Sequence, residues 1–488
     1  MRDMSLTRRQ FVFTTLATPV AVGLAQQIAS ATAPAFLSRG LNQNSKLRLL
    51  KVGCGGMGQS DLSQLVDHKM IEVVGLCDVD QRQLDGWTMD STNDKGEVRK
   101  ARLPGVATFR DWREAYAKLD KNFDAMCCST ADHMHAPISM AAMNMGKHIY
   151  CQKPLARGAW ENRALAEAAA RMPSVVTQMG TQRIATKFRQ YGGMLLRQGV
   201  IGPVKEVYAW TNRPAGWWPQ GNPRPEGTDP IPEWLSWDLF LGTSPDRPYK
   251  NGYTPFAWRG TIDWGTGAFG DMGCHMLDVP FYELDLGAPI SAVCNPVKAS
   301  SDQFPESESV VVKYGPNKMT SKDGLTLKWF DGGQFPDFKA LGLPEGWEGG
   351  EQGKNAVKGD GGVILVGEKG TMWFPIEYAW ARVFVDGKPV ELDRKELTPK
   401  EFEAQFKQTN HWHNWVDACL AGKKDACASR FEKGGKMCES LSIGAMSCVE
   451  PGKVLEYDAA KCVFKNSAAA SAALRSPYRK GWEVAGLA

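Results

Sequence analysis

Three polar side chains in this sequence are of the types that move a proton on and off a carbon-bound oxygen. Asp271 and His275 are four residues apart, so they would share one face of a helix. A histidine can take the proton of an alcohol near neutral pH, and the aspartate could orient the substrate or the ring. Lys153 follows an apolar run, and its ammonium could stabilise an oxygen on which negative charge develops.

Each of these residues also has a purely structural interpretation. Asp271 could cap a helix, His275 could be a packed core residue, and Lys153 could be an exposed surface lysine. A divalent metal held by Asp271 and His275 would lack a third ligand in the sequence, and we predict no metal site.

A glycine-rich segment lies between two apolar runs near the N-terminus. The runs at 47–52 and 73–77 read as buried strands, and the glycines between them would form a tight turn at the start of a helix. Asp78 then stands where a carboxylate can accept a hydrogen bond from a ribose diol. The segment predicts a dinucleotide site and redox chemistry, with an ordinary glycine-rich turn as the alternative. The residues that we expect to contact the cofactor here are Gly53, Gly55, Gly56, Met57, Gly58 and Asp78.

Strand and helix signals alternate over residues 47–179. This alternation predicts an α/β fold with a doubly wound parallel sheet that carries helices on both faces. The segment 132–135 is read as a loop that lines the cofactor cleft, with His135 at the start of the next helix, rather than as a metal cluster.

The pattern changes in residues 180–488. Longer alternating strands predict a C-terminal α/β domain with an open, largely antiparallel sheet. Proline, glycine and tryptophan cluster between 214 and 248, which indicates a long irregular loop. Seven tryptophans fall between 210 and 264, and we expect more than half of them to be structural. The candidate substrate contacts are Arg213, Trp258, Arg259 and Asp263.

The N-terminal residues have the pattern of an export signal. Arg8 and Arg9 precede an apolar stretch, and 31–33 is a small-x-small cleavage candidate. We read 1–33 as a twin-arginine signal peptide and 34–46 as a linker, with a frayed N-terminus as the alternative. Twin-arginine export carries folded proteins, so it would deliver a protein with NAD bound to the periplasm. The twin-arginine translocase is then an expected partner.

Composition excludes some functions. The formal net charge of +4 is small for 488 residues, and no basic run suggests a nucleic-acid partner. Several of the twelve cysteines fall in predicted central strands, where cysteine behaves as a small apolar residue, and we expect no disulfide framework.

Taken together, these motifs resemble the glucose–fructose oxidoreductase, inositol dehydrogenase and rhizopine-catabolism family (Gfo/Idh/MocA). The resemblance covers nearly all of the chain after the leader, and the tail at 478–483 resembles that of exported members. It is carried by the glycine turn with Asp78 and by the segments 129–137, 153–154, 179–183 and 270–275.

The resemblance implies that residues 47–179 form a Rossmann domain that binds NAD or NADP. It implies that residues 180–488 form an α/β domain that binds substrate and often supplies an oligomer interface, and hence a homo-oligomer. It implies that Lys153, Asp271 and His275 are the catalytic set. One departure is Gln152, where many members carry glutamate, and this removes a charge near Lys153. Asp78 with no basic residue directly after it favours NAD over NADP, although Arg82 is near. The further cofactor contacts that it implies are Ser129, Thr130, His135, Gln152 and Lys153.

Three functions are consistent with this pattern. The first is an NAD(P)-dependent oxidoreductase that acts on a CH–OH group of a sugar, polyol or glycoside. The second is an NAD-dependent glycoside hydrolase or lyase that oxidises its substrate transiently, with tightly bound NAD. The third is a secreted sugar-binding protein without activity, which the intact glycine turn and Lys153 disfavour.

Overall fold

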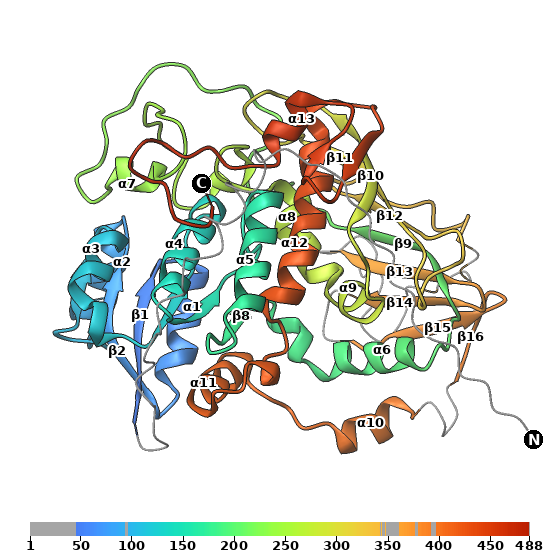
Figure 1. The fold of residues 1–488 in the computed structure, drawn as a ribbon, viewed down its shortest axis with the longest axis horizontal. Coiled ribbons are helices and arrows are strands. Elements are labelled where there is room, and N and C mark those ends of the chain that lie inside the picture. The colour runs from blue at the N-terminus through green and yellow to red at the C-terminus, as the bar shows by residue number, and fades with distance from the viewer. Residues whose placement is uncertain are drawn as a thin grey trace, which may run out of the picture. The chain divides into compact units, whose positions relative to one another are not determined.

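A computed structural model describes residues 45–92, 96–341, 343, 347, 361–375, 379–391 and 397–487. All described residues belong to one compact unit (Figure 1). The predicted signal peptide, and the linker up to residue 44, lie outside the described residues. No helix among the described residues is long and apolar enough to cross a membrane.

The first sheet has six parallel strands in the order β5-β2-β1-β6-β7-β8. The strand order reverses between β1 and β6, and in such sheets ligands bind beyond the carboxyl ends at this switch point. The predicted doubly wound Rossmann sheet is confirmed. Its strands are β1 (Leu47–Val52), β2 (Ile71–Cys77), β5 (Ala107–Phe109), β6 (Ala125–Cys128), β7 (His148–Cys151) and β8 (Thr177–Met179). Its helices are α1 (Met57–Val66), α2 (Gln81–Thr88), α3 (Trp112–Leu119), α4 (Asp132–Asn144) and α5 (Ala159–Arg171).

The second sheet has ten strands in the order β16-β15-β14-β13-β9-β12-β11-β10-β17-β18, and only β9 and β12 among the described neighbours run parallel. The predicted open, largely antiparallel sheet is therefore confirmed. Its strands are β9 (Val204–Trp210), β10 (Pro289–Val297), β11 (Ser307–Tyr314), β12 (Leu325–Phe330), β13 (Gly362–Gly367), β14 (Thr371–Pro375), β15 (Arg382–Val385), β16 (Lys388–Pro389), β17 (Leu455–Asp458) and β18 (Val463–Phe464). A separate small ribbon pairs β3 (Ser91–Thr92) with β4 (Val98–Arg99).

Helices join the two sheets. Figure 1 shows α5, α8 (Gly267–Met276) and α12 (Phe431–Met446) side by side between them, and α12 packs on α5, on α8 and on strand β10. The glycines of α12 permit this close packing, because a Cβ at Gly435 would meet the backbone of α5 at 2.7 Å. The remaining helices are α6 (Lys187–Arg197), α7 (Trp237–Leu241), α9 (Asp278–Glu283), α10 (Pro399–Gln405), α11 (His411–Ala421) and α13 (Ala468–Ala473).

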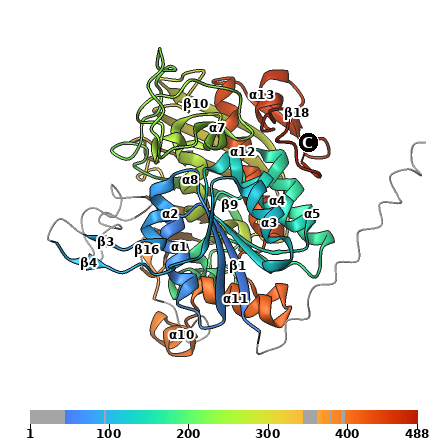
Figure 2. The same cartoon turned by 90° about the vertical axis from the view of Figure 1, so that its left-hand side faces the viewer.

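The C-terminal part of the chain returns to the first sheet. Helix α11 lies against β1 and α1, as Figure 2 shows from the side. Trp415 and Val416 of α11 are buried with Leu47 and Leu62 in one core. Asn410 caps this helix by accepting from Trp412 and His413 N–H, and Gly422 ends it at φ 63°. Residues after 179 thus complete the core around the first sheet.

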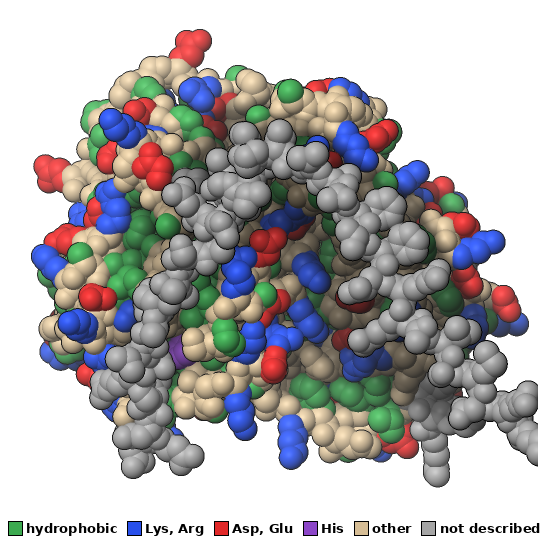
Figure 3. Space-filling view, in the orientation of Figure 1, with side chains coloured by type: hydrophobic (Ala, Val, Ile, Leu, Met, Phe, Trp, Pro, Cys, Tyr) green, Lys and Arg blue, Asp and Glu red, His purple; other side chains and the backbone are tan. Residues whose placement is uncertain are grey.

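The structure shows the state of the cysteines and the distribution of surface charge. All twelve cysteines are buried and free. On the face shown in Figure 3, acidic and basic side chains are interspersed.

Candidate active site

The glycine turn connects β1 to α1, and two of its glycines have positive φ angles, 81° at Gly53 and 52° at Gly56. A Cβ at Gly53 would lie 2.5 Å from the Ser129 carbonyl oxygen, and one at Gly58 would collide with the Gly53 carbonyl. A Cβ at Gly56 would meet nothing within 4 Å, because this residue faces an open pocket. The turn therefore leaves free space directly at the N-terminus of α1, as a bound pyrophosphate requires.

Asp78 follows β2, and its side chain is hydrogen-bonded to the backbone of the glycine turn. Its carboxylate accepts hydrogen bonds from Cys54 N–H at 2.6 Å and from Asp80 N–H at 2.9 Å. Burial raises the pKa of Asp78, and these two backbone donors act against that shift. The carboxylate lines the pocket, where its remaining lone pairs could accept from a ribose. These residues fit an NAD site.

One pocket of about 490 Å³ extends from the glycine turn to helix α8. Gly58 and Asp263 do not line it. The predicted residues that do line it are Gly53, Gly55, Gly56, Met57, Asp78, Ser129, Thr130, His135, Gln152, Lys153, Arg213, Trp258, Arg259, Asp271 and His275.

Lys153 and Asp271 meet at the end of the pocket away from Asp78. The Lys153 Nζ donates to Asp271 Oδ1 at 2.8 Å and to the Asp271 carbonyl at 3.1 Å. Arg213 and Arg259 each approach the same carboxylate to 3.5 Å. Burial alone would raise the pKa of Asp271, but Lys153 and Arg259 outweigh it and hold this pKa well below its usual range. Asp271 is therefore ionised at neutral pH.

His275 lies one turn after Asp271 on α8, as the four-residue spacing predicts. Its Nδ1 is buried and has no hydrogen-bond partner among the described residues. Burial, together with the charges of Lys153 and Arg183, lowers the pKa of His275 well below 6.5. The imidazole is therefore neutral at pH 7 and has a lone pair to accept a proton.

The segment after β6 is helical earlier than we predicted, because α4 begins at Asp132 rather than at His135. His135 Nδ1 lies 2.7 Å from the Pro154 carbonyl and Nε2 lies 3.0 Å from the Thr130 carbonyl. The ring thereby joins the loop before α4 to the loop that carries Lys153.

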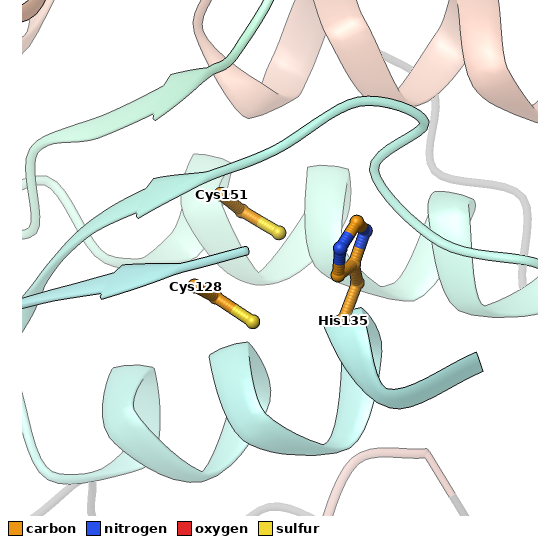
Figure 4. Close-up of side chains that lie close together, drawn as sticks. All are labelled: Cys128, His135 and Cys151. Carbon is orange, nitrogen blue, oxygen red and sulfur yellow. The ribbon is translucent and has the colours of Figure 1, made fainter. Parts of the chain in front are cut away.

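Cys128, His135 and Cys151 form a buried cluster whose ligand atoms lie within 4.8 Å of one another. Figure 4 shows the sulfur atoms of both cysteines, one on β6 and one on β7, pointing toward the imidazole ring. A metal would need a lone pair on a ring nitrogen, and both nitrogens of His135 already face carbonyl oxygens. We therefore assign no metal to this cluster.

The sequence analysis missed a buried polar network beneath the pocket. Lys51 on β1 and Asp61 on α1 are both fully buried, and Ser129 bridges them with contacts of 2.6 and 2.7 Å. Trp412 from α11 donates to Asp61 at 2.8 Å. Burial raises the pKa of Asp61, and Lys51 and these donors act against that shift. A lysine within the apolar run 47–52 was the available signal for this network.

Gln152 belongs to the same network. Its side-chain amide donates to both oxygens of Asp61, at 2.9 and 3.0 Å, and its Oε1 accepts from Lys153 N–H at 3.2 Å. A glutamate at position 152 would place a second carboxylate against the buried Asp61. Gln152 thus connects the buried Asp61 on α1 to the backbone of Lys153.

The remaining predicted contacts divide between the pocket and the core. Trp217, which is 46% exposed, and Trp258 line the pocket. Asp263 instead pairs with Arg247 at 2.9 Å, and Arg247 also pairs with Asp302. Four more of the seven tryptophans are buried and do not line the pocket: Trp210, Trp218, Trp237 and Trp264.

Comparison with known proteins agrees with this geometry. A model described as an oxidoreductase family with an NAD-binding Rossmann fold matches residues 47–180. A model of the C-terminal alpha/beta domain of the same family matches residues 210–335. Together the two matches cover more than half of the chain, and the chain belongs to this Gfo/Idh/MocA oxidoreductase family.

Two curated relatives match shorter stretches. The chain is 26% identical over 184 residues to levoglucosan dehydrogenase of Pseudarthrobacter phenanthrenivorans, which covers 38% of each chain. It is 34% identical over 111 residues to a glycosyl hydrolase family 109 protein of Stenotrophomonas maltophilia, 22% of this chain and 23% of that protein. The aligned part spans less than half the length of either relative.

Among solved structures, the chain resembles in fold the WlbA dehydrogenase from Bordetella pertussis, determined with NADH and UDP-GlcNAcA. The TM-score is 0.54 at 15% identity, covering 85% of this chain and 99% of that chain.

Proposed function

We propose that this protein is an NAD-dependent oxidoreductase that acts on a CH–OH group of a sugar, polyol or glycoside. The observation that carries the proposal is the placement of Lys153, Asp271 and a neutral His275 in the same pocket as the glycine turn and Asp78. Bound NAD would supply the hydride acceptor. The family membership and the levoglucosan dehydrogenase match support this assignment.

The roles of the side chains follow from their charges. His275 takes the proton of the substrate hydroxyl, because its ring is neutral and lines the pocket. Lys153 holds the same oxygen while negative charge develops on it. Asp271 keeps the Lys153 ammonium directed at this point through the 2.8 Å contact.

A second function is favoured by the match to a glycosyl hydrolase family 109 protein. In such a reaction the same oxidation would be transient and would serve glycoside cleavage, so the cofactor would have to stay tightly bound. A sugar and glycoside panel separates the two. Net formation of reduced nicotinamide supports the oxidoreductase, whereas release of an aglycone with no net reduction supports the glycosidase. If no compound gave either signal, both functions would be contradicted.

The cofactor assignment can be tested at Asp78. Replacing Asp78 with alanine should weaken NAD binding by about 1–3 kcal/mol, the scale for losing a charged hydrogen-bond acceptor. Isothermal titration calorimetry measures this loss directly. Asp90→Ala, which removes an exposed carboxylate outside the pocket, is the matched control. Equal affinities of the wild type and Asp78→Ala would rule out this ribose contact.

We also propose that the chain is exported by the twin-arginine route to the periplasm with NAD bound. The supporting pattern is Arg8-Arg9 before an apolar stretch, in a chain whose fold belongs to a cofactor-binding family. Changing both arginines to lysine should retain the precursor in the cytoplasm, as measured by fractionation and immunoblotting. Export of that double variant at the wild-type level would refute the route.

A further inference from the structure

Three cations surround one ionised carboxylate at the α8 end of the pocket. Lys153, Arg213 and Arg259 all lie within 3.5 Å of the Asp271 carboxylate, and the side chains of the three cations are only 14–19% exposed. Their positive charges therefore exceed the single negative charge of Asp271 in a largely dehydrated region, where excess charge of one sign is unfavourable.

The other carboxylates of the pocket do not fully balance this charge. Asp78, Asp80 and Asp111 lie at the ends of β2 and β5, with the glycine turn. Asp132 accepts from Thr266 Oγ1 at 2.8 Å, and burial raises its pKa to about 7, with Arg259 acting against the shift. The oxidised nicotinamide ring is itself cationic, so a bound cofactor would add positive charge here.

Both arginines stack on an aromatic ring that lines the pocket. The Arg213 guanidinium lies 3.8 Å from the centre of the Trp217 ring, and that of Arg259 lies 4.3 Å from Trp258. The buried Arg213 Nε has no hydrogen-bond partner among the described residues, and neither does Asp271 Oδ2. A stacked guanidinium presents its N–H edge to a planar or tetrahedral anion.

We propose that the substrate of this site is a sugar that carries an anionic group, a carboxylate or a phosphate, bound by Arg213 and Arg259. The inference rests on the proposed function and specifies its substrate class. The partly exposed Trp217 and the pocket-lining Trp258 provide apolar surface for the sugar ring beside the two guanidinium groups. Asp271 is left to accept from a hydroxyl of the same sugar.

The anion would also bring His275 into a working range. Lys153, Arg183 and Arg213 all lower the pKa of His275, after burial as the main cause, and Asp271 alone is opposed to them. An anionic substrate group on Arg213 and Arg259 would offset this positive charge. The imidazole would then become a stronger base only when the correct substrate is bound, which favours proton transfer at that moment.

The test uses the purified chain saturated with NAD. Hexoses are compared in matched sets of the neutral sugar, its uronate and its 6-phosphate, with glucose, galactose and mannose as the parent sugars. Binding is measured by calorimetry and by the shift in unfolding temperature, so affinity is read without turnover. We expect the anionic member of at least one set to bind at least about 10-fold more tightly than the neutral member. The uronate and phosphate arms identify which anion the site takes.

Arginine variants assign the effect to the proposed residues. Arg213→Gln and Arg259→Gln should each cost about 10- to 100-fold in affinity for the anionic sugar and leave the neutral sugar within about twofold. Arg213→Lys should retain part of the affinity, because it keeps the charge but loses the planar fork. Arg475→Gln is the matched control, since Arg475 stacks on Trp160 outside the pocket.

Three results would overturn the inference. One is that the neutral sugar binds as tightly as the anionic members in every set. The second is that no anionic sugar binds. The third is that the arginine variants lose neutral and anionic sugars equally. Failure of the proposed function looks different: no sugar would yield reduced nicotinamide or a released aglycone, while anionic sugars still bound in an arginine-dependent way.

Discussion

His275→Ala should lower turnover by about 10²- to 10⁴-fold, the usual cost of losing a general base, while the protein still folds and binds NAD. The reason is that His275 supplies the neutral ring nitrogen next to Lys153 and Asp271. Lys153→Ala should cause a loss of similar size, because the developing oxyanion would lose its cation. The combined loss should be smaller than the product of the two, since both residues act on one oxygen.

The measurement is the steady-state rate on whichever sugar the binding panel identifies, with NAD affinity determined in parallel. His413→Ala is a matched control, because His413 lies on α11 and does not line the pocket. Turnover of His275→Ala or Lys153→Ala within about threefold of the control would remove that residue from the proposed mechanism.

Asp61→Asn should lower the free energy of unfolding by about 3–5 kcal/mol, the cost of leaving a buried charge without its partner. Lys51 and Asp61 are fully buried and are joined through Ser129, so removing the carboxylate leaves the Lys51 ammonium in an apolar strand environment. Adding Lys51→Met to this variant should restore part of the loss, because the unpaired charge is then removed as well.

Urea unfolding measures both effects, with Asp417→Asn as the control for an exposed carboxylate. If Asp61→Asn fails to accumulate as folded protein, recovery of folding by Lys51→Met is the corresponding result. If Asp61→Asn had the same free energy of unfolding as Asp417→Asn, the charge of Asp61 would not stabilise the fold.

The features that sequence could predict are those set by neighbouring residues in the chain. The glycine turn, its flanking strands and the four-residue spacing of Asp271 and His275 on α8 depend on local geometry, and the structure places them as predicted. The alternation of strand and helix signals up to Met179 also predicts the parallel sheet, because each signal has its own period.

The features that sequence could not predict depend on long-range contacts. Trp412 reaches Asp61 across 351 positions, and nothing local to either residue indicates that contact. Asp263 was a candidate substrate contact because its carboxylate could bond sugar hydroxyls, but it pairs with Arg247 instead. The return of α11 and α12 to the first sheet is likewise set by tertiary packing rather than by their own sequence patterns.

The most direct test of the account is a single-turnover experiment on the purified protein with stoichiometric NAD. The protein is mixed with the neutral and anionic sugars and their glycosides, and reduced nicotinamide is followed by fluorescence. The account predicts that at least one sugar produces reduced nicotinamide in the wild type, and that Lys153→Ala binds NAD and the sugar but forms the signal at least about 10²-fold more slowly. Absence of that signal in NAD-loaded wild type with a sugar that demonstrably binds, or an equal rate in Lys153→Ala, would contradict it.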